Sequence, residues 1–191
     1  MKATVILASS SPRRRALLEQ VGISFSLDPA DVDERMLPRE KPEAYAVRVA
    51  LDKARVAAGR ARTGIVIAAD TIVVVGDSIL GKPVDAADAR RMLSMLSGRE
   101  HEVITGLAVM DAASRRSSVR TAVTQVCFRK LSEREISAYV ATGEPLDKAG
   151  AYGIQERGAL LVERIEGCYS NVVGLPLSLL GEMLANFGII L

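Results

Sequence analysis

The chain has 191 residues, of which 25 are basic and 23 acidic, so the formal net charge is only +2. This length suits one domain with a real hydrophobic core, and the charge balance excludes a general field for binding polyanions. Aromatic residues make up only 4% of the chain and Trp is absent. We therefore expect no nucleic-acid partner, because single-strand binding platforms stack bases on aromatic rings.

Cysteine and histidine are too scarce for several common kinds of site. Cys127 and Cys168 are the only cysteines and His101 is the only histidine. This excludes a disulfide scaffold, a zinc site and most histidine-based metal clusters, and it argues against a Ser-His-Asp triad. No apolar run reaches the ~20 residues of a membrane span, and the N-terminus lacks the layout of a signal peptide. We expect a cytoplasmic protein with no membrane partner.

The N-terminal segment predicts a strand, a serine-rich loop and a helix. Thr4–Ala8 is a short apolar strand candidate, Ser11 is a good N-cap, and Pro12 suits the first helical position. Arg13–Arg15 then place three cations where the helix dipole is already positive. They are explained if an anion such as a phosphate binds there. The alternative is a solvated basic turn.

A second strand, an acidic loop and a long helix follow. We predict a strand over Ile23–Leu27, a loop over Asp28–Arg39 and a helix over Pro42–Gly59, where apolar residues recur at helical spacing. One of the loop acids could reach a metal. Lys53 lies near the edge of the apolar stripe, and spacing alone favours a surface lysine there.

The central stretch Ile65–Pro83 is the most informative part of the sequence. Ile65–Val75 is almost unbroken β-branched or small apolar sequence, typical of a strand buried on both faces. Asp70 interrupts it, and a buried carboxylate costs several kcal/mol unless a cation, a metal or a proton compensates it. A turn and a short return would bring Lys82 back near it. Two alternatives are a cap at a strand end and a structural ion pair. If the charge is isolated, Asp70→Asn should be at least as stable as the wild type.

The rest of the chain mixes helix and strand signals, and we find no internal repeat. Helices are predicted from Asp85 to Leu96, from Ser132 to about Thr142, and over Pro176–Phe187, and Glu135 is the capping-box partner of Ser132. Strands are predicted over His101–Met110, Ser117–Phe128 and Leu160–Ile165. A polar loop is predicted over Gly167–Gly174. The two long strands should form a hairpin whose alternation leaves one sheet face open to water. Glu144–Gln155 has no clean period, which is typical of a functional segment. The pattern indicates an α/β or α+β fold, with the hairpin as a possible distinct lobe.

Several separated motifs together resemble one family. They are Leu7–Arg14 (Leu-Ala-Ser-Ser-Ser-Pro-Arg-Arg), Ala69–Val73 (Ala-Asp-Thr-Ile-Val), Gly81–Pro83, Leu96–Gly98, Asp147–Gln155 (Asp-Lys-Ala-Gly-Ala-Tyr-Gly-Ile-Gln) and Val173–Pro176. In this order they resemble the Maf family of nucleoside triphosphate pyrophosphatases, end to end. The Walker A and Gly-x-Gly-x-x-Gly patterns are absent.

The resemblance implies a fold, a reaction and a site. It implies a single domain over residues 1–191, with a mixed, elongated and twisted sheet flanked by helices and two lobes around a central cleft, as in inosine triphosphate pyrophosphatase. It implies hydrolysis of a nucleoside triphosphate to the monophosphate and pyrophosphate with a divalent metal cation, Mg or Mn, in a homodimer. The family's general base matches Asp70, its substrate-discriminating positions match Arg13, Thr71 and Gln155, and its phosphate-binding positions match Ser9, Arg14, Lys53 and Lys82. An acidic family position matches Glu34, which with Asp70 is a candidate metal ligand.

The segment Tyr152–Gln155 (Tyr-Gly-Ile-Gln) resembles the branch of the family that acts on dTTP and UTP. That branch is distinct from the branch that acts on 7-methyl-GTP. Glu156 departs from the pattern of the dTTP and UTP branch, which often carries a small residue at this position. A competing function is a nucleotide-binding regulator of cell division and septum formation without turnover. Asp70 separates the two, because only the enzyme needs an ionised base. A sequence-specific DNA binder fits poorly, since three arginines are too short a basic footprint.

Overall fold

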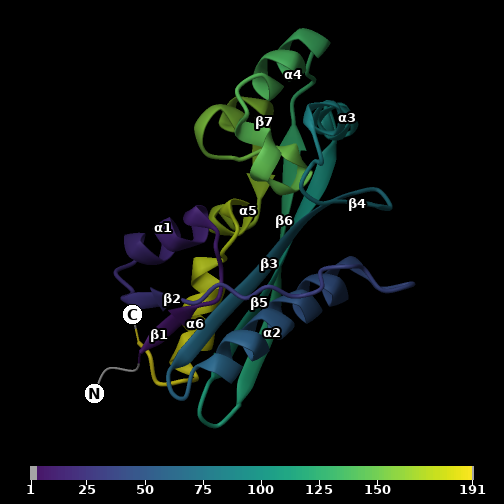
Figure 1. Cartoon of the computed structure of the whole chain (residues 1–191). Coiled ribbons are helices and arrows are strands. Elements are labelled where there is room, and N and C mark those ends of the chain that lie inside the picture. Colours follow the sequence, from purple (N-terminus) through teal and green to yellow (C-terminus); the bar gives the residue numbers. More distant parts are fainter. Residues whose placement is uncertain (1–3, 191) are drawn as a thin grey trace. The chain divides into compact units, whose positions relative to one another are not determined.

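The computed structural model describes residues 4–190 and shows a mixed α/β chain (Figure 1). Its strands are β1 (Val5–Leu7), β2 (Phe25–Leu27), β3 (Ile65–Val75), β4 (Ser78–Leu80), β5 (Glu100–Asp111), β6 (Ser117–Phe128) and β7 (Val162–Glu166). Its α-helices are α1 (Pro12–Gln20), α2 (Pro42–Arg60), α3 (Ala86–Leu96), α4 (Glu133–Val140), α5 (Tyr169–Val173) and α6 (Leu177–Ala185). Three short 3₁₀ helices, η1 (Glu144–Asp147), η2 (Ala149–Ala151) and η3 (Glu156–Leu161), occupy the segment without a clean period. Among the described residues, no helix is both long and apolar enough to cross a membrane.

The strands form one seven-stranded sheet in the order β2-β1-β3-β5-β6-β7, with β4 paired to β3. Strand β1 runs parallel to both β2 and β3, whereas β4 is antiparallel to β3 and β7 is antiparallel to β6. The sheet is therefore mixed, which confirms the predicted fold class.

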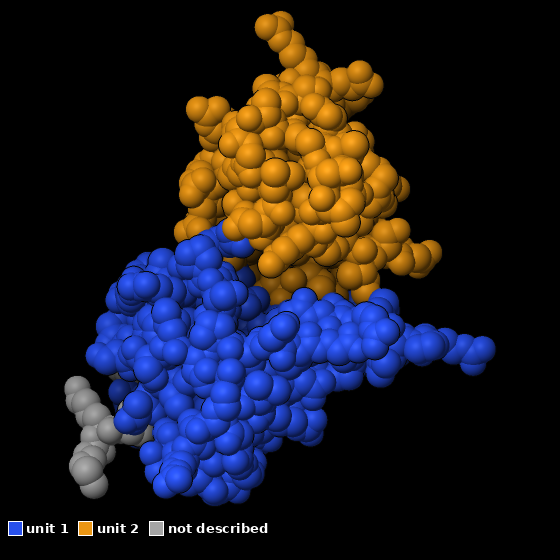
Figure 2. Space-filling model, in the orientation of Figure 1, with its two compact units in different colours: residues 1–70, 105–122, 174–191 blue, residues 71–104, 123–173 orange. Residues whose placement is uncertain are grey.

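The chain divides into two compact units, coloured separately in Figure 2. Unit 1 comprises residues 1–70, 105–122 and 174–191, and unit 2 comprises residues 71–104 and 123–173. Strands β3, β5 and β6 contribute residues to both units. Each unit has its own hydrophobic core, in which apolar side chains from helices and strands pack against one another.

In unit 1, the packing of α2 on the sheet depends on small residues. The alanines of α2 pack against Val66 and Ala68 of β3. The helix approaches β5 so closely that a Cβ on Gly106 would lie 2.2 Å from the carbonyl oxygen of Ala46. Small side chains therefore let the helix lie close to the strands.

Most predicted elements are present, with two corrections. Residues 167–174 were expected to form a polar loop, but Tyr169–Val173 form α5, where the amides of Asn171 and Val172 donate to the carbonyl of Cys168. The hairpin was expected to leave one face open to water, but only β6 keeps exposed and half-buried residues along its length, whereas β5 is buried along almost its whole length. Polar residues such as Thr105 and His101 gave β5 its alternating pattern, and both are buried.

Candidate active site

Parallel pairing of β1 with β3 brings the serine loop, at the carboxyl end of β1, near the buried acid in the middle of β3. Leu7 pairs with Ile67, and the amide of Ala8 donates to the carbonyl of Ile67 at 2.8 Å. Ser9 therefore follows the end of β1 near the level at which Asp70 lies in β3. Carboxyl ends of neighbouring parallel strands are where α/β sheets bind ligands.

The loop after β1 begins α1 as the sequence predicts. The Ser11 hydroxyl caps the helix by accepting from the Arg14 amide, and Pro12 takes the first position. The Ser9 hydroxyl accepts from Nη1 of Arg14 at 3.2 Å and also from the Ser11 amide. The Arg14 Nε donates to the carbonyl oxygen of Gly174 at 2.8 Å. Arg14 is thus anchored on both sides, which holds its guanidinium in one place.

Electrostatics link these arginines to the acids. Burial lowers the pKa of Arg14 from its ordinary value, and the charge of Arg13 lowers it further. The negative charges of Asp70 and Glu34 act in the opposite direction. Arginine remains protonated in proteins, so Arg14 is a fixed cation beside two carboxylates. Arg15, by contrast, is exposed and pairs with Glu19 at 2.8 Å within the helix.

Lys53 is buried, which corrects the expectation of a surface lysine. It is 9% exposed, and its Nζ lies 2.7 Å from Oδ1 of Asp70 and 2.7 Å from Oε1 of Glu34. The reason is that Asp70 lies on the side of β3 that α2 covers. Alternate residues of β3 share a face, so Asp70 lies on the same side as Val66 and Ala68, over which α2 packs.

Asp70 is therefore a compensated charge, not an isolated one. It is 8% exposed, and the Lys53 ammonium supplies the cation that a buried carboxylate needs. Of the three compensations expected for this carboxylate, a cation, a metal or a proton, the structure shows the cation. Glu34 is much more accessible, with its side chain 55% exposed.

Tyr45 is a member of this cluster that the sequence did not single out. Its hydroxyl donates to the backbone oxygen of Glu34 at 2.7 Å. Burial, followed by the charges of Asp70 and Glu34, raises the pKa of Tyr45 to about 12. A signal was available, since Tyr45 precedes Lys53 by about two turns on the same helix. The tyrosine ties the acidic loop to α2.

The other expected site residues belong to unit 2. Thr71 follows Asp70 in β3 and is partly buried, and β4 leads the chain back along β3 toward the exposed Lys82. Gln155 is exposed at the start of η3, and its side chain makes no capping bond there. Among residues 4–190, no hydrogen bond or ion pair joins Lys82 to Gln155 directly. The backbone links them instead, through the Gly150 amide, which donates to the Gly81 carbonyl at 3.0 Å.

The acids of unit 1 fit a divalent cation held partly by substrate. Within the described residues, no group of three or more His, Cys, Asp or Glu side chains could hold a metal alone. Asp70 and Glu34 do converge, since both contact the same ammonium. Mg²⁺ in nucleotide sites is commonly bound through one or two carboxylates plus phosphate oxygens and water. The donor set suits that arrangement.

The chain is similar to known proteins along nearly its whole length. The family described as Maf-like protein matches residues 4–187. A dTTP/UTP pyrophosphatase of Anaeromyxobacter dehalogenans (strain 2CP-C) is 52% identical over 190 residues, covering 98% of this chain and 96% of the relative. Relatives with the same description from Syntrophomonas wolfei and Geobacter sulfurreducens are each 51% identical over 182 and 187 residues, covering 95% and 98% of this chain and 96% and 98% of their own length.

Solved structures share the fold at low identity. A HAM1 protein from Coxiella burnetii matches with a TM-score of 0.56 and 17% identity, over 96% of this chain and 99% of that one. The Staphylococcus aureus Ham1 protein gives the same TM-score and coverage at 16% identity. These likenesses concern the fold alone. The family match and the relatives, each covering nearly the full chain, establish that this chain belongs to the Maf family.

Proposed function

We propose that this protein is a nucleoside triphosphate pyrophosphatase that hydrolyses dTTP and UTP to the nucleoside monophosphate and pyrophosphate. The observation that carries the proposal is the buried Asp70–Lys53 pair beside the anchored Arg14. An ionised carboxylate and fixed cations together are what hydrolysis of a phosphoanhydride needs. The full-length relatives described as dTTP/UTP pyrophosphatases support the choice of reaction and substrates.

In this mechanism the cationic side chains act on the phosphate groups and the Asp70 carboxylate acts on the attacking water. Arg13, Arg14 and Ser9 bind phosphate oxygens and balance the charge that grows on them. Lys82 is a further proposed phosphate-binding residue. Because phosphoryl transfer involves little covalent chemistry by the protein, positioning and charge supply most of the rate.

Asp70 is the proposed general base. The Lys53 ammonium donates to Oδ1 at 2.7 Å and orients the carboxylate, so we assign proton transfer to Oδ2. Asp70 takes a proton from water as the water oxygen bonds to the α-phosphorus. The bond from that phosphorus to the bridging oxygen breaks, and pyrophosphate leaves. A divalent cation, Mg or Mn, held by Asp70 and Glu34 would supply further charge neutralisation on the phosphates.

Gln155 is the proposed reader of the base. Its amide offers one acceptor and two donors, which complement the N3–H and the flanking carbonyls of uracil and thymine. Cytosine reverses this pattern at positions 3 and 4, so the same amide would leave polar groups unpaired. Thr71 and Arg13 are the other proposed discriminating residues.

The test is a panel of nucleotides scored for pyrophosphate release with Mg or Mn and with a chelator. We expect UTP and dTTP to be cleaved well above CTP, ATP and GTP, and the chelator to stop the reaction. Release from no nucleotide would overturn the enzyme, whereas equal cleavage of the purine nucleotides would overturn only the base assignment. Gln155→Ala should narrow the gap between UTP and CTP more than it lowers the best rate.

The remaining proposals concern organisation. We propose that residues 1–191 act as one domain, that the protein acts in the cytoplasm, and that it forms a homodimer. The mass of the particle in solution, measured by light scattering, tests the dimer.

A further inference from the structure

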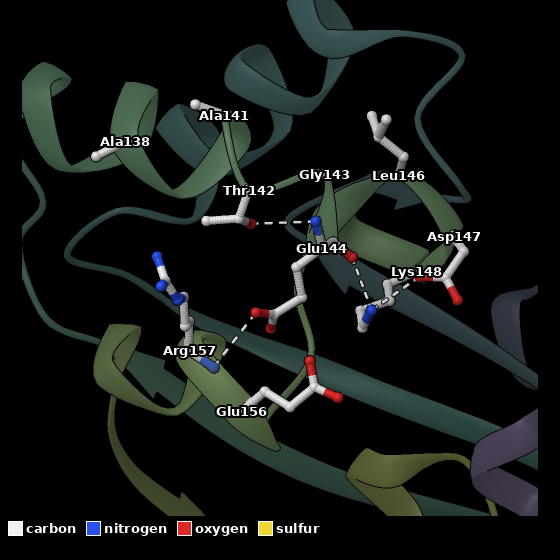
Figure 3. Close-up of a pocket in the computed structure, with 10 residues that line it drawn as sticks. All are labelled: Ala138, Ala141, Thr142, Gly143, Glu144, Leu146, Asp147, Lys148, Glu156 and Arg157. Atoms are coloured by element: carbon white, nitrogen blue, oxygen red, sulfur yellow. Dashed lines mark hydrogen bonds and ion pairs between the residues drawn. The ribbon is translucent and has the colours of Figure 1, made fainter.

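In unit 2, one carboxylate accepts three hydrogen bonds, one from a tyrosine of α4 and two from amides that closely follow Gln155. Oε1 of Glu144 accepts from the Tyr139 hydroxyl at 2.8 Å and from the Gly158 amide at 3.1 Å. Oε2 of Glu144 accepts from the Arg157 amide at 3.3 Å. Figure 3 shows Glu144 on the wall of a surface pocket, with its carboxylate directed at the backbone of Arg157. Both amides lie just after Gln155, so the acid holds the outgoing side of that turn.

The incoming side of the turn is held by the same network. The Tyr139 hydroxyl donates to Glu144 and accepts from the Gly153 amide at 3.2 Å. Burial raises the pKa of Tyr139 well above its ordinary value, so the hydroxyl keeps the proton that it donates. Tyr139 thereby joins Gly153, two residues before Gln155, to the acid that binds the residues after it.

The two sides of the turn also touch directly. A Cβ on Gly158 would lie 2.0 Å from the carbonyl oxygen of Gly153 and 2.7 Å from the Tyr139 hydroxyl. Only glycine fits at that contact. Lys148 also binds the backbone of Glu144, since its Nζ donates to the Glu144 carbonyl oxygen at 2.7 Å. The backbone on both sides of Gln155 is fixed, while the Gln155 side chain is left exposed.

We propose that Glu144, acting with Tyr139, is a positioning residue that fixes the Gln155 turn and so sets the selectivity for the base. The inference rests on the proposed reading of the base by Gln155. Glu144 does not touch the reacting phosphates in this account. Its loss should therefore alter the choice of base more than the chemical step, since a misplacement of about 1 Å can cost about 10²-fold.

The first experiment compares kcat/KM for UTP and CTP in the full-length Glu144→Gln variant. A glutamine has one acceptor oxygen, so at least one of the three donors loses its partner. We expect the UTP to CTP ratio to fall by about tenfold or more, with kcat/KM for CTP changing less than about threefold. Glu133→Gln is the matched control, because it removes the same charge from an exposed position on α4 and should leave the ratio unchanged.

Tyr139→Phe gives an independent arm. It removes only the hydroxyl, and it should lower the same ratio. The double variant should fall no further than the more affected single variant, because both act through one network. An unchanged ratio in both single variants, or an equal fall for UTP and CTP, would overturn the proposal.

Amide hydrogen exchange, measured without nucleotide, separates this proposal from the proposed function. Glu144→Gln should speed exchange at Arg157 and Gly158 and leave the buried strand residue Val109 unchanged. If the wild-type protein releases no pyrophosphate from any nucleotide, the proposed function fails. Hydrogen exchange alone then tests whether Glu144 fixes the Gln155 turn. Unchanged exchange at both amides would then refute it. Faster exchange throughout the protein in both single variants would also refute it, because the network would then serve overall stability.

Discussion

The Nζ atom of Lys53 lies 2.7 Å from Oδ1 of Asp70, and both side chains are about nine-tenths buried. This pairing changes what each residue is expected to do. Asp70 is held at a defined position, and Lys53 cannot move away without leaving a buried carboxylate unpaired. Under the proposed function we therefore expect the pair to act as an oriented base, and the arginines of α1 to be the main phosphate ligands.

The first prediction concerns Asp70→Asn. Turnover of UTP should fall by the ~10²–10⁴-fold typical of a lost general base, while nucleotide binding persists. Asp77→Asn, in the exposed turn after β3, is the control and should keep full activity. Near wild-type turnover in Asp70→Asn would remove Asp70 from the mechanism. Persistent binding without turnover is the result that separates a base from a mere phosphate ligand.

The same variant should also be less stable than the wild type, which reverses the expectation from the sequence. Asn leaves the buried Lys53 ammonium with Glu34 as its remaining partner. Breaking a buried pair costs about 3–5 kcal/mol, and Glu34 should keep the loss below that range. Urea unfolding at neutral pH measures the change. A free energy of unfolding equal to or above that of the wild type would show that Lys53 does not need this carboxylate.

The three consecutive arginines provide an internal comparison. Arg13→Ala and Arg14→Ala should each lower turnover by an amount equivalent to roughly 3–4 kcal/mol, as for a lost transition-state donor. Arg15→Ala should leave turnover unchanged, because Arg15 is exposed and paired with Glu19. Steady-state kinetics with UTP measure all three. Equal losses of turnover at the three positions would indicate that the arginines act through a general positive potential and not through specific contacts of Arg13 and Arg14.

The sequence predicted the elements well because their signals are local. The Ser11 and Ser132 caps, the turn after Val75 and the apolar stripe of α2 each depend on neighbouring residues, and all are confirmed. Lys53 was misjudged because helical spacing does not reveal which strand residue faces a given position. That fact follows from the register of β3 beneath α2, a property of distant parts of the chain.

The network around Gln155 could not be predicted for a similar reason. Glu144 and Gly158 lie fourteen positions apart in the chain, in a segment of short 3₁₀ helices. No hydrophobic period marks such a segment, so its contacts follow from tertiary packing. What the sequence could show was that the segment is unusual in composition. The roles of Asp70, Arg13 and Gln155 came from the family resemblance and stay predictions until variants test them.

Glu156, which departs from the pattern of the branch, has a backbone conformation that gives a stability prediction. Its φ is +53°, a left-handed conformation in which side chains are strained and glycine is not. Glu156→Gly should raise the free energy of unfolding by about 1 kcal/mol. Glu163→Gly in β7 is the matched control and should lower it, because glycine in a strand loses more entropy on folding. A loss of stability in Glu156→Gly would show that the Glu156 side chain makes a favourable contact that offsets the strain.

The last prediction concerns the single histidine, which is buried in unit 2. His101 is 2% exposed, its Nε2 lies 2.8 Å from the Tyr152 hydroxyl, and burial lowers its pKa from 6.5 to about 4. Between these two values the unfolded chain binds a proton that the folded protein does not. The free energy of unfolding should therefore decrease as the pH falls from 6.5 to 4, by about 3 kcal/mol in total, and should not depend on His101 above pH 6.5.

The measurement is the free energy of unfolding in urea at several pH values between 4.5 and 7.5, for the wild type and for His101→Gln. Carboxyl groups with lowered pKa values, such as Glu40 and Glu135 at about 2, contribute mainly below pH 4.5 and are common to both proteins. Glutamine does not titrate, so the difference between the two curves isolates His101. We expect the wild-type curve to approach the variant curve, or to cross it, as the pH falls toward 4.5. Parallel curves across the whole range would show that His101 titrates equally in the folded and unfolded states.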